Sequence, residues 1–256
     1  NDRTFTYDTG GDADEILCDD VTGDSDGLQE DVGRLQMTGG TLIADIVTHE
    51  GMFEISKSRS TIEAGRIRFD DLGTTSINSE LVLDASGGSY AVIEAGANIH
   101  GNGTLSNAPG SRMYLMDDAE IDVHFENRGD LELNANSMIP SLGGAAAASV
   151  RSFSQSSTGA WLVEIYGTPP NQFDWLAVDG TAQLGGALDM YGAGRYGASI
   201  GDVLELIFAG DIVGTFDAVM ADGGPGVSIG QIDGQDASIA VYYGDTPHLN
   251  FDENTV

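Results

Sequence analysis

Residues 105–115 read Leu-Ser-Asn-Ala-Pro-Gly-Ser-Arg-Met-Tyr-Leu, and residues 125–133 read Phe-Glu-Asn-Arg-Gly-Asp-Leu-Glu-Leu. Each stretch has an apolar residue two positions before an asparagine (Asn107 or Asn127), then a turn containing glycine, then alternating apolar residues. The offset is about 20 residues, in the range of one solenoid coil. Because one coil cannot bury its inner face alone, the repeat predicts stacked coils. Asparagine at each corner suits a ladder of side-chain amides.

The same period-two alternation, typical of strands with one buried face, recurs on both sides of this repeat. Before residue 143 it predicts strands at 41–47, 51–55, 66–69, 80–83, 90–93, 113–116, 121–125 and 131–133. After an Ala-rich and Ser-rich stretch it predicts strands at 160–166, 173–178, 182–184, 187–190, 202–208 and 237–243. We therefore expect an all-β chain, a right-handed β-solenoid with a less regular C-terminal β region. Two β-sandwich domains are the alternative.

These patterns divide the chain into five parts. They are an acidic β segment at 1–39, solenoid coils at 40–143, a linker at 144–158, a C-terminal β region at 159–245 and an acidic tail at 246–256. The linker is inferred from the change in composition, because Gly, Ala and Ser replace the alternating pattern there.

Four stretches carry a resemblance to a known family. They are Phe-Asp-Trp-Leu-Ala-Val-Asp-Gly-Thr-Ala-Gln-Leu-Gly-Gly-Ala-Leu at 173–188, Gly-Asp-Val-Leu-Glu-Leu-Ile at 201–207, Val-Gly-Thr-Phe at 213–216 and Ile-His-Gly-Asn-Gly-Thr-Leu-Ser-Asn at 99–107. They resemble solenoid coils in the passenger regions of bacterial autotransporters and related secreted β-helix proteins. The resemblance implies the solenoid, and it does not imply an activity or a route of secretion. Physically, Gly185-Gly186 suits a tight corner between two strands.

The charge of the chain is strongly negative. Asp and Glu number 41 against 10 Lys and Arg, which gives a net charge of −31. Such a surface repels nucleic acid and anionic lipid and attracts cations, so we expect no nucleic-acid partner. No run of about 18 apolar residues is present, so we expect no membrane insertion. A single cysteine, Cys18, excludes an internal disulfide, and leaves open a buried thiol or an intermolecular bridge. We expect a secreted protein at the cell surface.

The sequence offers little for catalysis. Carboxylate pairs such as Asp70-Asp71 and Asp117-Asp118 fall at turns, where acids are common. The four histidines lie far apart with no metal-ligand spacing, and no Gly-x-Ser-x-Gly or phosphate-binding loop occurs. Calcium is the one ion that the pattern favours, because hard oxygen donors crowd a glycine-containing loop. The candidate ligands are Asp12, Asp14, Asp19, Asp20, Asp24 and Asp26, and a solvated acidic turn is the alternative.

We therefore expect an extracellular structural protein and not an enzyme. It would be a subunit of a fibre, sheath or surface layer that forms a head-to-tail homopolymer, because open coil ends leave backbone groups without partners. The residues expected at these contacts are Phe5, Tyr7, Ile16 and Leu17 at one end and Ile239, Val241 and Tyr243 at the other. An adhesin or a module that binds surface glycans is the first alternative. A polysaccharide-active β-helix enzyme is the second.

Overall fold

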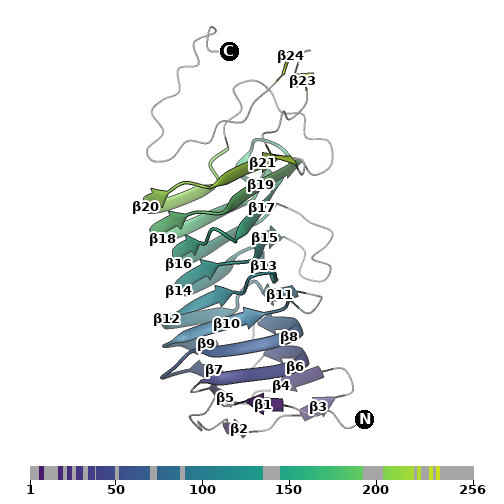
Figure 1. The fold of residues 1–256 in the computed structure, drawn as a ribbon, viewed down its shortest axis with the longest axis vertical. Coiled ribbons are helices and arrows are strands. Elements are labelled where there is room, and N and C mark those ends of the chain that lie inside the picture. The colour runs from purple at the N-terminus through teal and green to yellow at the C-terminus, as the bar shows by residue number, and fades with distance from the viewer. Residues whose placement is uncertain are drawn as a thin grey trace.

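The computed structural model describes residues 6–8, 17–19, 22–24, 27–30, 34–37, 39–49, 52–69, 74–86, 90–134, 145–192, 204–221, 224–225, 231–232 and 235–236. These residues form a 22-stranded sheet, a separate two-stranded sheet of β23 (Gln231–Ile232) and β24 (Gln235–Asp236), and one 3-10 turn, η2 (Pro170–Gln172). Figure 1 shows the large sheet wound into a column of stacked coils. Within the described residues, no helix is long and apolar enough to cross a membrane.

The parallel strands run round three faces of this column. Face A contains β5 (Arg34–Met37), β7 (Met52–Ile55), β9 (Thr74–Ile77) and the first halves of β12 (Asn98–Asn107), β14 (Ala119–Asn127), β16 (Ala147–Gln155), β18 (Trp175–Leu184) and β20 (Ile207–Gly214). Face B contains β10 (Glu80–Asp84) and the second halves of the same five strands. Face C contains β4 (Gly27–Glu30), β11 (Tyr90–Ile93), β13 (Arg112–Met116), β15 (Asp130–Asn134), β17 (Ala160–Ile165), β19 (Ala187–Gly192) and β21 (Ala218–Ala221). Strands β6 (Gly40–His49) and β8 (Ser60–Phe69) span faces B and C.

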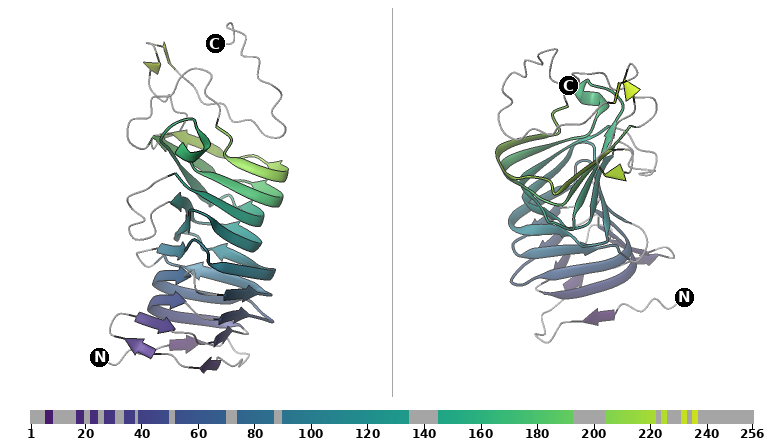
Figure 2. Two further views of the ribbon diagram at one scale, coloured as in Figure 1. Left: turned by 180° about the vertical axis from the view of Figure 1, so that it is seen from behind. Right: turned by 45° about the horizontal axis from the view of Figure 1, so that its top comes forward.

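The repeat read from the sequence is the register of the coils. Leu105 pairs with Phe125 and Asn107 with Asn127 between β12 and β14. On face C, Leu115 of β13 pairs with Leu133 of β15. The expected all-β solenoid is therefore confirmed, and equivalent positions of successive coils lie directly above one another (Figure 2).

The core is a set of stacked inward-facing side chains. On face B, Leu81, Leu105, Phe125 and Phe153 occupy equivalent positions in β10, β12, β14 and β16, and all are almost fully buried. The rings of Phe125 and Phe153 lie 5.9 Å apart between centroids. Burying a side chain of this size stabilises the fold by roughly 1.5–3 kcal/mol, so a continuous stack of this kind holds each coil to the next.

The stretch expected to be a linker, 144–158, contains a full coil strand. Strand β16 pairs with β14 on one side and β18 on the other, and its burial alternates through Ala148, Val150 and Phe153. Ala146 and Ala148, from the stretch that suggested a linker, are buried, whereas Ser149, Ser152 and Ser154 are only partly buried. Coils therefore continue in register to β20 and β21, so residues 160–221 extend the same solenoid where they are described. The expected strand at 237–243 lies outside the described residues.

The corner of the coil at residue 186 requires a glycine. Gly186 has φ of +60°, and a Cβ there would lie 2.2 Å from the carbonyl oxygen of Gly159 and 2.4 Å from that of Ser156. Only a residue without a side chain fits against the backbone of the coil beneath. The tight corner predicted at Gly185-Gly186 is thus present, and Leu176 and Val178 of the preceding strand point inward.

The two ends of the column differ in their pairing. At the N-terminal end, β1 (Thr6–Asp8) pairs antiparallel with β6, β2 (Leu17–Asp19) with β5, and β3 (Thr22–Asp24) with β4. At the C-terminal end, β21 pairs antiparallel with the two-residue β22 (Gly224–Pro225), while the described part of the chain gives β20 a partner on one side, β18.

Candidate functional site

The expected calcium ligands lie mainly outside the described residues. Asp19 and Asp24 belong to β2 and β3, where the backbone is described and the side chains are not. Asp12, Asp14, Asp20 and Asp26 fall outside the described ranges. In the part of the chain that the structure describes, no group of three or more His, Cys, Asp or Glu is arranged to hold a metal ion. Calcium at the N-terminal segment stays a prediction.

Two of the contact residues expected at the N-terminal end lie in strands that pair with other strands of the same chain. Tyr7 lies in β1 and pairs with Leu42 of β6, and Leu17 lies in β2 and pairs with Gln36 of β5. These strands thus lie antiparallel along the first coil of their own chain. Phe5, Ile16, Ile239, Val241 and Tyr243 fall outside the described residues.

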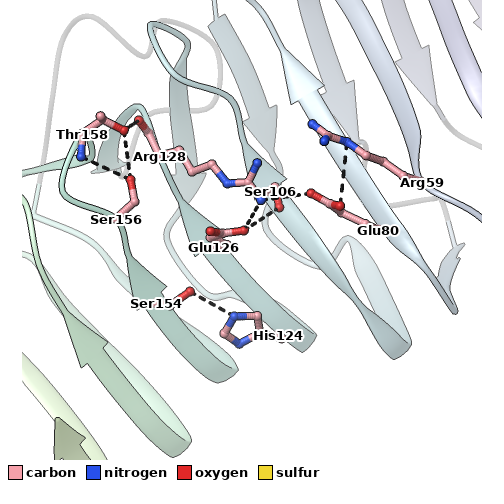
Figure 3. Close-up of polar contacts among 9 residues, drawn as sticks. All are labelled: Arg59, Glu80, Ser106, His124, Glu126, Arg128, Ser154, Ser156 and Thr158. Carbon is pink, nitrogen blue, oxygen red and sulfur yellow. Dashed lines mark hydrogen bonds and ion pairs between the residues drawn. The ribbon is translucent and has the colours of Figure 1, made fainter.

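A ladder of polar side chains covers the outer surface of face B (Figure 3). We call it the face-B ladder, and its members are Arg59, Glu80, Ser106, His124, Glu126, Arg128, Ser152 and Ser154. Arg128 bridges two coils, because its Nη2 lies 3.0 Å from Glu80 Oε1 and also pairs with Glu126. Arg59 Nε lies 3.7 Å from the other oxygen of Glu80. Exposed ion pairs of this kind contribute roughly 0–1 kcal/mol each, and they leave the acids and arginines of this face neutralised by one another.

His124 is held by the next coil of the face-B ladder. Its Nδ1 lies 2.8 Å from Ser152 Oγ and its Nε2 lies 3.0 Å from Ser154 Oγ. Partial burial lowers the pKa of the imidazole. His100 lies on the neighbouring β12, but the register places it opposite Asp122 and places His124 opposite Thr104. The two histidines therefore do not form a pair of ligands on adjacent strands.

An amide ladder lies inside the corner between faces B and C. Asn107 Nδ2 donates to Asn127 Oδ1 at 2.9 Å, and Asn127 Nδ2 donates to Gln155 Oε1 at 3.1 Å. The three side chains also donate to backbone carbonyls, those of Asp130, Ala160, Gly185 and Ala187. All three are buried. The ladder predicted from Asn107 and Asn127 is present, and Gln155 extends it by one coil.

A second cluster lies on the outer side of face C. We call it the carboxylate–tyrosine cluster, and its members are Glu132, Glu164, Tyr166, Asp174 and Tyr191. Glu132 and Glu164 lie in β15 and β17 with 6% of their surface exposed, and Asp174 is fully buried just before β18. The Tyr166 hydroxyl donates to Glu164 Oε2 at 3.0 Å. The Tyr191 phenol of β19 hydrogen-bonds to both glutamates.

Burial dominates the electrostatics of this cluster. It raises the pKa of Asp174 to about 8, although two backbone N–H groups that favour the ionised form oppose the shift. Burial also raises the pKa of Glu132, partly offset by Arg112. The pKa of Tyr166 rises to about 12, through burial and then its bond to Glu164. Carboxyl groups with raised pKa values can hold a proton near neutrality, which ordinary surface acids cannot.

Sequence reasoning missed the carboxylate–tyrosine cluster. Glu132 and Glu164 alternate with inward apolar residues, a pattern that indicates solvated outer positions. The available signal was Asp174, a lone acid between Phe173 and Trp175 at the start of a strongly apolar strand. An acid in that setting is exceptional, because unpaired carboxylates are rarely buried.

The last described coil exposes apolar surface. Phe208 of β20 is 45% exposed and Val213 is 47% exposed, and Phe208 packs edge-on against Trp175 of β18 at 5.3 Å between ring centroids. The core-side residues Ile207 and Ile212 are only partly buried.

Comparison with protein-family models, with curated proteins and with solved structures finds no match.

Proposed function

We propose that this chain is an extracellular structural protein, a subunit of a fibre, sheath or surface layer, and that copies associate through β-strand contacts at the C-terminal coil. The observation that carries the proposal is the edge of β20. Among the described strands, β20 is hydrogen-bonded to β18 alone, so its other side offers a ladder of backbone groups to an added strand. Such an edge is a ready template for pairing with another chain.

The side chains of this coil support a second copy as the occupant. An added strand would bury Phe208 and Val213 on the outer side and complete the packing of Ile207 and Ile212 on the core side. Parallel pairing of this kind joins neighbouring coils within the column. The N-terminal end differs, because its strands β1 and β2 pair antiparallel. Contact between two unlike ends leaves a free end on each copy, so it propagates into a filament unless the rotation between copies closes a ring.

The charge of the chain sets the conditions for association. A net charge of −31 makes copies repel one another, so cations that screen or bridge the acids should promote contact. This dependence separates the proposal from simple aggregation of a neutral protein.

The test is the oligomeric state of matched variants, measured by light scattering and negative-stain electron microscopy in salt and calcium. Phe208→Lys with Val213→Lys places two charges beside the β20 edge and should keep the protein monomeric. Met52→Lys is the control, because Met52 is 51% exposed on β7, far from the β20 edge, and its replacement should leave that edge and the assembly through it intact. A monomeric parent protein at high concentration, or unchanged assembly of the double variant, would make the proposal wrong.

The aromatic pair favours one other function. Trp175 and Phe208 offer aromatic surface on the last two strands of face A, which suits an adhesin or a module that binds surface glycans. In that case Phe208→Ala should abolish binding to a glycan array while the parent protein is monomeric. Under the assembly proposal, the parent protein binds no glycan on the array, and the same substitution weakens the association between copies.

A further inference from the structure

One carboxylate joins three consecutive strand segments in the C-terminal half. Asp174 Oδ1 accepts from the backbone N–H of Ala146 at 2.9 Å, and Asp174 Oδ2 accepts from that of Glu164 at 2.8 Å. Ala146 precedes β16, Glu164 lies in β17, and Asp174 itself leads into β18. The backbone repeats these links, since Asp174 N donates to Glu164 O and Trp175 N donates to Ala146 O. Asp174 therefore sits where three segments are held together.

The groups around Asp174 are mostly acidic. Glu164 and Tyr166 approach from β17 and the segment after it, Glu132 from β15 and Tyr191 from β19. Asn134 hydrogen-bonds to Glu132, and from β13 Tyr114 and Arg112 also approach Glu132. In the described part of the chain, three buried carboxyl groups thus lie near one another, and the Arg112 guanidinium approaches one of them, Glu132. Ionising all three together is unfavourable in a buried site.

We propose that the carboxylate–tyrosine cluster is a pH-sensitive clamp: Asp174 links three strand segments, and its ionisation beside two other buried carboxyl groups destabilises the C-terminal coils. The clamp is independent of the assembly proposal, because it acts within one chain. Its effect would nevertheless reach the C-terminal end, since Trp175 follows Asp174 and packs against Phe208 of β20.

The direction of the pH dependence follows from the raised pKa of Asp174, about 8 against an ordinary value of 3.8. Between these values the folded chain keeps a proton that the unfolded chain has released. Stability is therefore fully present below about pH 4, falls as pH rises, and levels off above about pH 8. One retained proton changes the folding equilibrium about tenfold per pH unit, which gives a loss of more than about a hundredfold from pH 5.5 to 8.

The chain carries its own reporters for this region. It has two tryptophans, Trp161 in β17 and Trp175 in β18, on the two strands adjacent to Asp174. Trp161 is fully buried and Trp175 is partly buried, so opening these coils changes the emission of both. Circular dichroism then reports separately on the remaining coils.

The experiment is urea unfolding of the full chain at pH 5.5, 7 and 8.5, followed by tryptophan fluorescence. The parent protein should unfold at lower urea as pH rises, and Asp174→Asn, which cannot ionise, should lose this step. Glu120→Gln is the control, because it removes one charge from an exposed position on β14 and should keep the parent profile. The same control accounts for groups elsewhere in the chain that titrate in this range.

A second variant covers the case in which Asp174→Asn fails to fold. Glu132→Gln removes a neighbouring negative charge, so Asp174 should ionise at lower pH and stability should level off earlier than in the parent protein. A parent profile that is flat from pH 5.5 to 8.5 would overturn the clamp. So would a Glu132→Gln or Asp174→Asn profile that matches the parent profile.

Discussion

Replacing Asn127 by leucine tests what holds the corner between faces B and C. The Asn127 amide takes part in three buried hydrogen bonds, accepting from Asn107 and donating to Gln155 Oε1 and to the carbonyl of Ala160. Leucine has a similar volume and makes none of them. Asn107 Nδ2 keeps its bond to the carbonyl of Asp130, but its other N–H loses its acceptor, so one buried donor and two acceptors are left without these partners.

The expected destabilisation is about 3 kcal/mol. A buried polar group left without its partner costs roughly 1–3 kcal/mol, and three are left here, which gives about 4 kcal/mol near the lower end of that range. The added apolar surface of leucine offsets a part of this, of order 1 kcal/mol. For a chain of this size 1 kcal/mol corresponds to about 2–4 °C in Tm, so Asn127→Leu should lower Tm by roughly 6–12 °C.

Thermal and urea unfolding followed by circular dichroism measures this change. Glu120→Ala is the matched control, because Glu120 lies on the exposed side of the same strand and its loss should stay within about 0.5 kcal/mol. Asn127→Asp keeps the shape but can only accept and adds a buried charge, so it should destabilise at least as much as leucine at pH 7. If both Asn127 variants match the control, the amide ladder does not hold the corner and the reasoning is wrong.

Three further outcomes are expected. Gly186→Ala should destabilise more than Gly110→Ala, because both glycines have positive φ but only Gly186 would place its Cβ against backbone oxygens, and the difference in urea midpoint measures that clash. The His124 imidazole should titrate below the ordinary 6.5 in an NMR pH series, since burial lowers its pKa, and a midpoint at or above 6.5 would contradict its position between two serines. Calcium should raise Tm through the acid cluster of residues 12–26, and an equal shift with magnesium at matched ionic strength would count against a specific site.

Much of the fold could be predicted because, in a solenoid, residues one repeat apart in the sequence are the residues that pair between neighbouring strands. The residues that the repeat aligns, Leu105 with Phe125 and Asn107 with Asn127, are neighbours in register between β12 and β14. The sequence analysis did not recognise the repeat at β16. There serine takes outer positions that are charged in other strands, and alanine fills an inner position. Composition alone made that stretch read as a linker, although its alternation had not changed. Gln155 was missed for the same reason, since the ladder accepts any amide and the corner signature there has no asparagine.

The carboxylate–tyrosine cluster lay beyond prediction for a different reason. Alternation assigns Glu132 and Glu164 correctly to the outer side of their strands, but it cannot tell whether an outer side is solvated. The outer side of face C is not solvated at this place, because the outward-facing Tyr114, Glu132 and Glu164 are almost fully buried. The buried state of Asp174 depends in addition on the excursion through η2 that returns the chain to the amides of Ala146 and Glu164. Successive coils bring these acids into one site from positions 132, 164 and 174, so the raised pKa of Asp174 is a property of the stack and not of any one coil.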